Sequence, residues 1–214
     1  MPPPSQAADT NGSLDRPAQI LNAALICFAK RGFHQASMHD IAAEAGVSVG
    51  LIYRYFQNKE AVISAMADRH KKEIHELLER ARQAPRLLES LEILFTAHCC
   101  EEGEPRLLSA FVVDLYAEAS RNPRVADLVR DMLQTAMAGV TDLIARAPEA
   151  RHAAHDLTPA QMAELIFAVA RGMLMRDVLQ PHALTAAERR TRQLEVTRSL
   201  WRLLFKSESE PAYA

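Results

Sequence analysis

The sequence is poor in glycine and has no long apolar run, and each shortage excludes a class of protein. Only 7 of the 214 residues are glycine, and neither GxGxxG nor GxxxxGK[ST] occurs, so the phosphate-binding loops of nucleotide-dependent enzymes are absent. No apolar run approaches the roughly 18 residues that a membrane span needs. The first 15 residues hold neither Lys nor Arg and no apolar core, so we do not expect a signal peptide.

Cysteine is also scarce. The 3 cysteines, Cys27, Cys99 and Cys100, are odd in number and too few for a disulfide framework. Neighbouring residues on a helix point about 100° apart, so His98, Cys99 and Cys100 cannot converge on one metal ion. We therefore expect no metal, no cofactor, and a location in the reducing cytoplasm.

Helix-forming residues dominate what remains. Ala and Leu occur 36 and 25 times, whereas Val, Ile and Thr occur 11, 9 and 8 times. This ratio predicts an all-α fold. The net charge is −2, with +1 in residues 1–82 and −3 in residues 83–214. So small a basic excess carries no argument for DNA binding, which must rest on where the charges lie.

Prolines and apolar periodicity divide the chain. We expect a disordered arm over 1–15, a helix-turn-helix domain over 16–63, a ligand-binding and dimerisation domain over 64–206, and a flexible tail over 207–214. Residues 147–157 have no apolar periodicity and predict a loop. The predicted helices are 16–31, 38–45, 49–55, 59–82, 86–102, 105–120, 123–146, 159–179 and 186–205.

Residues 37–56 predict two short helices joined by a tight turn. Ser37 can cap the first helix, and Gly46 can adopt the left-handed conformation that ends it. Ser48 can then cap the second helix, whose buried side includes Ile52 and Phe56. This pattern is typical of a helix-turn-helix, in which the second helix enters a DNA major groove.

Tyrosines and basic side chains gather on the other side of that second helix. The hydroxyls of Ser37, Tyr53 and Tyr55 and the ammonium of Lys59 can meet DNA phosphates. The alternative is a helical hairpin packed into a core with two tyrosines at its rim. The density of Tyr53, Arg54, Tyr55 and Lys59 around so short a helix favours DNA binding.

A family resemblance rests on these residues. The run Ile41-Ala42-x-x-Ala45-Gly46-Val47-Ser48-x-Gly50-x-Ile52-Tyr53-x-Tyr55-Phe56-x-x-Lys59-Glu60 resembles the N-terminal signature of TetR-family regulators. The preceding helix, with Phe28 and Arg31-Gly32-Phe33, is similar too. The resemblance covers 17–63 and implies an all-helical dimer that binds DNA and a small ligand. The DNA-facing residues that it implies are Ser37, Ser48, Val49, Gly50, Tyr53, Arg54, Tyr55 and Lys59.

The sequence departs from the family at one position and resembles one of its branches elsewhere. His39 stands where the family often has a longer basic side chain. The segment from Pro105 to Pro123 and the run Ala170-Arg171-Gly172-Met173 are similar to the branch of choline-responsive betaine regulators. The ligands of that branch are diverse, so the resemblance predicts architecture and not ligand identity.

The C-terminal helices predict a ligand pocket. Methionine adapts to irregular shapes, which suits a pocket, although methionine at helical spacing is also typical of plain core. Asp114 and Glu118 lie at or within an apolar helix face, where they could anchor a cationic ligand or pair with Arg121 or Arg124. The expected pocket residues are Phe95, His98, Cys99, Phe111, Asp114, Leu115, Glu118, Met132, Met137 and Phe167.

The last two predicted helices favour a dimer. Residues 162–175 are apolar nearly all round, and a single chain has little left to cover both this helix and the apolar end of the next. The expected interface residues are Met162, Ile166, Val169, Gly172, Met173, Leu194, Leu200, Trp201, Leu204 and Phe205.

The sequence therefore predicts a ligand-responsive transcriptional regulator. We expect a homodimeric repressor that binds a pseudo-palindromic DNA operator and is released by a small, largely apolar effector. Two alternatives stay open. A helical adaptor would bind a protein partner through 194–205, and a helical enzyme would act through Asp114, Glu118 and a histidine, although no nucleophile–base pairing supports the enzyme.

Overall fold

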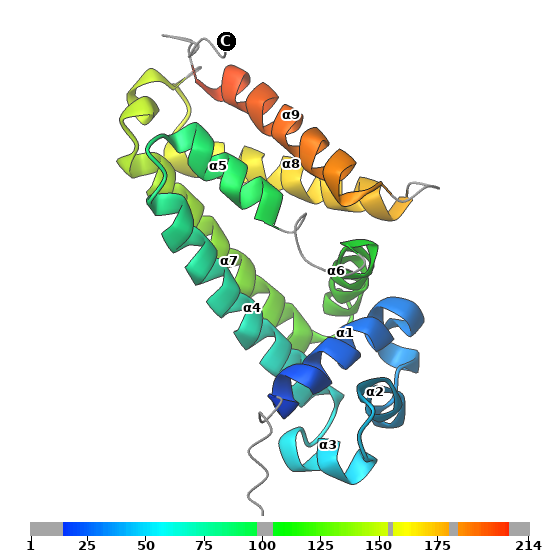
Figure 1. Cartoon of the computed structure of the whole chain (residues 1–214). Helices are drawn as coiled ribbons and strands as arrows, with labels where there is room; N and C mark the ends of the chain where they lie inside the picture. Colours follow the sequence, from blue (N-terminus) through cyan, green and yellow to red (C-terminus); the bar gives the residue numbers. More distant parts are fainter. Residues whose placement is uncertain (1–14, 98–104, 154–155, 180–183, 206–214) are drawn as a thin grey trace, which may run out of the picture.

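The computed structural model describes residues 15–97, 105–153, 156–179 and 184–205 (Figure 1). The predicted arm, except for Asp15, and the predicted tail lie outside these residues, as do His98, Cys99 and Cys100. The helices are α1 (Arg16–Gln35), α2 (Met38–Ala45), α3 (Val49–Tyr55), α4 (Lys59–Arg82), α5 (Leu87–Thr96), α6 (Pro105–Ala119), α7 (Pro123–Arg146), the 3₁₀ helix η2 (Pro148–His152), α8 (Pro159–Leu179) and α9 (Ala186–Leu204). The all-α prediction is confirmed.

A small head at one end of the molecule contains α1, α2 and α3 (Figure 1). Its core is formed by fully buried side chains such as Ile20, Phe28, Ile41 and Ile52. Burial of these apolar groups holds α2 and α3, which are too short to be stable alone, against α1. Residues of α4, α6 and α7 complete the same core, so the head is joined to the rest of the chain by packed side chains.

Two long helices, α4 and α7, run side by side from the head to the opposite end (Figure 1). Their close approach depends on Gly139 of α7, because a Cβ added there would lie 2.2 Å from Cδ1 of Leu78 on α4. The far end holds a second apolar core, built from α4, α5, α7, α8 and α9. Helix α6 lies between this body and α1, in position to contact both (Figure 1).

Most predicted helix ranges agree with the structure, whereas two helix ranges and one predicted loop differ for local reasons. The predicted end of the first helix at residue 31 falls just before Gly32, whose φ of 76° breaks the helix before a last turn to Gln35. The predicted helix 86–102 ends at Thr96 as α5, and residues 98–104 lie outside the described part. The segment predicted as a loop, 147–157, contains η2, which begins at Pro148.

Candidate functional site

Side-chain caps and one left-handed glycine fix the geometry of the α2–α3 unit. The Ser37 hydroxyl accepts a hydrogen bond from the Asp40 backbone N–H at 3.1 Å, and Asp40 Oδ2 accepts one from the Ser37 N–H at 2.9 Å. Gly46 ends α2 with φ 64° and ψ 34°, a conformation that costs glycine little. Ser48 caps α3 by accepting from the Leu51 N–H. The predicted caps and turn are confirmed.

Helix α3 is held from behind and exposed in front. Ile52 is fully buried and Phe56 is 8% exposed, so the predicted inner side of this helix is confirmed. On the opposite side, Tyr53 is 49% exposed and Tyr55 is 45% exposed, with Arg54 between them also exposed. These are the largest apolar rings that the head presents to solvent, and each carries a hydroxyl that can bind a phosphate.

The N-terminal end of α3 leaves room for a close partner. Ser48 and Gly50 are exposed, and Val49 is half-buried against the head core. No atom lies within 4 Å of a Cβ added at Gly50, so a bulky surface such as a DNA groove can approach the backbone there. The predicted residues of α3 therefore lie together on one exposed end of the head, and His39 is exposed on the neighbouring α2.

Two predicted DNA-facing residues have structural roles as well. The Ser37 hydroxyl donates to Asp40 Oδ2 at 2.6 Å, which uses its only proton inside the cap. Lys59 donates to the carbonyl oxygens of Phe33 and His34 at 2.7 and 3.1 Å, and its ammonium lies 4.7 Å from the centroid of the Phe33 ring. The predicted DNA contacts of Ser37 and Lys59 stay predictions, and either residue would have to share or exchange these hydrogen bonds to bind a phosphate.

The end of α1 is bound to two carboxylates of α6. The Phe33 backbone N–H donates to Asp114 Oδ2 at 2.7 Å, directly after the break at Gly32. His34 Nε2 lies 2.8 Å from Oε2 of Glu118, whose side chain is only 3% exposed. Glu118 also accepts from Asn122 at 3.2 Å, and Arg121 lies 3.7 Å away. Asp114 and Glu118, which were predicted to line a ligand pocket, thus contact the end of α1 and are not among the residues that line the cavities described below.

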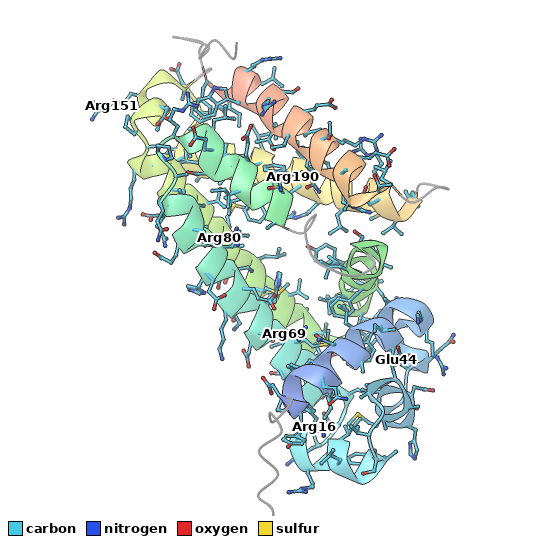
Figure 2. All side chains as sticks on the ribbon, viewed as in Figure 1. Arg16, Glu44, Arg69, Arg80, Arg151 and Arg190 are labelled. Carbon is cyan, nitrogen blue, oxygen red and sulfur yellow. The ribbon has the colours of Figure 1, made fainter. Side chains whose placement is uncertain are left out.

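The pairing alternative for Glu118 is partly confirmed. Arg121 is near it, as expected, whereas Arg124 pairs with Glu60 of α4 at 2.9 Å. A further link between body and head comes from Arg69, midway along α4 (Figure 2). Its guanidinium donates to Asn22 of α1 at 2.8 Å. The head is thus attached to α4 and α6 by several polar contacts, in addition to the apolar core that it shares with α4, α6 and α7.

A cavity of about 280 Å³ lies in the body, lined by residues from α4 to α9 and partly open to solvent. Among the predicted pocket residues, Phe95, Met132 and Phe167 line it. Met137 packs in the second core without lining the cavity, and His98 and Cys99 lie outside the described residues. Helix α6 contributes Leu108, Ser109, Val112 and Tyr116.

Phe111 and Leu115, also predicted as pocket residues, face the head and do not line this cavity. Phe111 stacks on Phe28 of α1 with ring centroids 6.2 Å apart, and Leu115 is buried in the head core. Both line a separate small space of about 90 Å³ between head and body. The two cavities share four lining residues, which are His70 of α4, Leu108 and Val112 of α6, and Met132 of α7. Helix α6 therefore forms part of the wall between them.

The residues predicted for a dimer interface on α8 and α9 differ in how far they are exposed in the single chain. Several of them face the interior of their own chain with 9% exposure or less, and a buried side chain adds little to a contact surface. These are Met162, Ile166, Met173, Leu200, Leu204 and Phe205. Val169, Leu194 and Trp201 are half-buried, and Gly172 is exposed with nothing within 4 Å of an added Cβ.

Other residues form the exposed apolar side of these two helices. Leu165, Met175 and Leu179 on α8 are 45%, 42% and 74% exposed, and Leu203 on α9 is 67% exposed. Helical periodicity alone could not separate them from the buried set, because α8 is apolar on most of its circumference.

The larger cavity is also lined by polar residues that were not predicted from the sequence. Tyr116, Arg171 and Arg189 line it together with Asp177. The signal for Arg171 was present, since it interrupts the apolar run 162–175. Arg189 and Tyr116 gave no comparable signal.

Two negative findings apply to the described residues. They contain no helix long and apolar enough to cross a membrane. They also contain no cluster of three or more His, Cys, Asp and Glu side chains suited to hold a metal ion.

The fold and the exposed α3 define a helix-turn-helix DNA-binding protein with a separate helical body. Comparison with known families agrees. Residues 20–66 match the family "Bacterial regulatory proteins, tetR family", and residues 87–202 match "BetI-type transcriptional repressor, C-terminal". The chain belongs to the TetR family of transcriptional regulators and has a BetI-type C-terminal domain. It is therefore a DNA-binding regulator and not an enzyme.

Individual relatives show how far the similarity extends. The transcriptional regulator UidR of Escherichia coli (strain K12) is 30% identical over 162 residues, which cover 73% of this chain and 78% of UidR. A transcriptional regulator from Saccharomonospora viridis in complex with choline has a TM-score of 0.72 at 19% identity, covering 91% of this chain and all of that one. FadR from Bacillus subtilis in complex with stearoyl-CoA has a TM-score of 0.65 at 20% identity, covering 84% and 96%.

Proposed function

We propose that this protein is a ligand-responsive repressor that binds a pseudo-palindromic operator as a homodimer in the bacterial cytoplasm. The observation that carries the proposal is the outward face of α3, where Tyr53, Arg54 and Tyr55 are exposed together while Ile52 and Phe56 anchor the helix. A short, rigidly held helix with aromatic hydroxyls and a guanidinium suits both phosphate contacts and base contacts in a major groove.

Binding as a dimer would set the geometry of the operator. A two-fold protein places two copies of α3 on two half-sites, one turn of DNA (about 34–36 Å) or a multiple of it apart. We propose that the second copy packs on the exposed apolar side of α8 and α9, at Leu165, Met175, Leu179 and Leu203. Gly172 lies on the same side of α8, and no atom of the described residues lies within 4 Å of a Cβ added there, which would allow a helix of the second copy to approach closely.

The proposed effector site is the cavity in the body. Its volume, about 280 Å³, and its largely apolar lining suit a small molecule with a substantial apolar part. Two relatives support effector binding in this fold, since one is in complex with choline and another with stearoyl-CoA. These ligands differ in charge and size, so they do not indicate which molecule this chain binds.

Helix α6 offers a direct route from the cavity to the head. One side of α6 lines the cavity with Leu108 and Val112, while Asp114 and Glu118 bind the end of α1. A ligand that displaces α6 would therefore move α1, and the continuous helix α4 would carry the same shift to α3. To change operator occupancy strongly, the ligand must favour one conformation by a few kcal/mol.

The experiment is selection of binding sites from random duplex DNA with the purified full chain. The proposal expects enrichment of an inverted repeat whose half-site centres are about 10 base pairs, or a multiple of that, apart. Enrichment of a single unrepeated site would contradict binding as a two-fold dimer, and absence of enrichment would contradict specific DNA reading.

A helical adaptor is the second candidate, and the exposed leucines of α8 and α9 are the observation that favours it. Sedimentation of the isolated protein separates the two. A stable dimer supports the regulator, whereas a monomer that leaves this apolar side open supports the adaptor.

A further inference from the structure

The cavity in the body is apolar along most of its wall. Helices α4 to α8 supply aliphatic and aromatic side chains to it, among them Ile74, Phe95, Val112, Phe167 and Leu174. Such a lining favours a ligand with an apolar body, because the transfer of apolar surface out of water is favourable.

The charged residues in the lining are not balanced. Arg189 and Asp177 form an ion pair at 3.0 Å with side chains only 7% and 11% exposed, so their charges largely cancel. Arg171 is the other arginine of the lining, and no carboxylate lies within ion-pair distance of it among the residues described here. With His70 neutral, the lining carries an excess of one positive charge.

Arg171 lies at the border between the cavity and the outside. Successive helical residues are about 100° apart, so Phe167, Ala170 and Leu174 lie to one side of Arg171 and Ala168 and Met175 lie to the other. The first three line the cavity, whereas Ala168 and Met175 are exposed. The guanidinium can therefore bind a group at the cavity margin without giving up its contact with water, which limits the cost of its burial.

Tyr116 of α6 provides a hydrogen-bond donor beside this arginine. Burial raises the pKa of the Tyr116 phenol, and the nearby charge of Arg171 offsets only part of that effect. The hydroxyl therefore stays protonated at neutral pH and can donate to an anionic oxygen. A guanidinium and a phenol side by side form a pair of donors suited to a carboxylate.

We infer that the cavity binds a small amphipathic anion, with its apolar body among the aliphatic and aromatic side chains and its carboxylate at Arg171 and Tyr116. This inference rests on the proposed function, since it names the chemistry of the effector. It also replaces the expectation of a cationic ligand, because Asp114 and Glu118 bind the head and line no part of this cavity. A quaternary ammonium ligand would meet an unpaired positive charge.

The test compares three probes of equal chain length that differ only in their polar end: octanoate, octanol and octyltrimethylammonium. Binding to the full-length protein is measured by isothermal titration calorimetry without DNA. We expect octanoate to bind about tenfold more tightly than octanol or octyltrimethylammonium, because only octanoate can form a charge-assisted hydrogen bond with Arg171. Arg171→Gln should remove most of this preference while leaving octanol binding unchanged. Arg151→Gln, an arginine far from the cavity, should leave the preference intact.

Three outcomes would overturn the inference: no binding of octanoate, equal or tighter binding of the alcohol or the ammonium compound, and an anion preference that persists in Arg171→Gln. A failure of the proposed function is distinguishable from these. Octanoate binding with no effect of octanoate on operator affinity would contradict the repressor mechanism and leave the anion preference standing.

Discussion

At the scale of single residues, the side-chain caps of the head helices can be removed one at a time, so the contribution of each cap to stability can be measured. Ser37 both accepts from and donates to Asp40, which closes the first turn of α2. We expect Ser37→Ala to lower the free energy of unfolding by about 1 kcal/mol, because it leaves the Asp40 N–H without its partner. Thermal unfolding measures this, and Ser199→Ala, at an exposed serine of α9, is the matched control. Equal effects of the two changes would contradict the assigned role.

The same cap predicts a dependence on pH. Hydrogen bonds from the Ser37 side chain and backbone lower the pKa of Asp40 below its ordinary value. A carboxyl group with a lower pKa in the folded than in the unfolded protein stabilises the fold. This contribution is fully present above the pKa of the unfolded state, about 3.9, and is lost as the pH falls through the pKa of the folded state. The stability difference between the native chain and Ser37→Ala should therefore shrink in acid, and a constant difference would contradict this account.

Asp114 is the residue on which the attachment of the head depends most directly. Its Oδ2 accepts from the Phe33 N–H at 2.7 Å, next to the break at Gly32. Asp114→Ala leaves that N–H without a partner, and we expect a loss of about 1–3 kcal/mol in thermal or urea unfolding. Asp127→Ala, an exposed carboxylate of α7 that pairs with Arg130, is the control and should have little effect. Similar losses in both variants would contradict a specific role for Asp114.

At the scale of elements, the close packing of α4 on α7 makes the strongest structural prediction. A Cβ at Gly139 would lie 2.2 Å from a methyl carbon of Leu78, and Leu78 is itself buried and lines the cavity. We expect Gly139→Val to lower the free energy of unfolding by about 1–3 kcal/mol, because the two helices must separate or Leu78 must leave its rotamer.

Gly50→Val serves as the control for Gly139→Val when the free energy of unfolding is measured. Gly50 lies on α3 with no atom within 4 Å of an added Cβ, so valine meets no neighbour there. If Gly50→Val destabilised the fold as much as Gly139→Val, the loss could not be assigned to the contact between α4 and α7.

The elements could be predicted from the sequence because their ends are marked locally. Ser37, Ser48 and Asn58 cap their helices, Gly46 ends α2, and Pro123 begins α7. The exposed side of α3 followed from the spacing of Ile52 and Phe56. Such signals depend on neighbours in the chain, so one sequence is enough to find them.

Tertiary placement could not be predicted in the same way. Asp114 and Glu118 share a helix with Leu108 and Val112, yet the first pair binds the head and the second pair lines the cavity. Which side of α6 meets α1 depends on contacts across 81 residues of chain, such as that between Phe33 and Asp114. For the same reason, periodicity did not separate the buried Met162 and Met173 from the exposed Met175 on α8.

At the scale of the whole molecule, the proposed dimer is tested by changing Leu179 and Leu203, the exposed leucines near the ends of α8 and α9. We expect the double variant Leu179→Glu and Leu203→Glu to shift the protein from dimer to monomer in analytical ultracentrifugation, because charges replace apolar contact area. We expect the variant to fold, because both side chains are exposed in the single chain, and circular dichroism checks this. A folded variant that remains a dimer would exclude this side of α8 and α9 as the interface.

The central claim is that the outward side of α3 reads DNA, and the affinity of Tyr53→Ala for the selected operator tests it most directly. The account predicts that Tyr53→Ala and Arg54→Ala each weaken operator binding about tenfold or more in a mobility-shift titration, with the oligomeric state unchanged. Arg151→Ala, at the end of the molecule opposite α3 (Figure 2), should bind like the native chain. Native operator affinity in both α3 variants would contradict the claim.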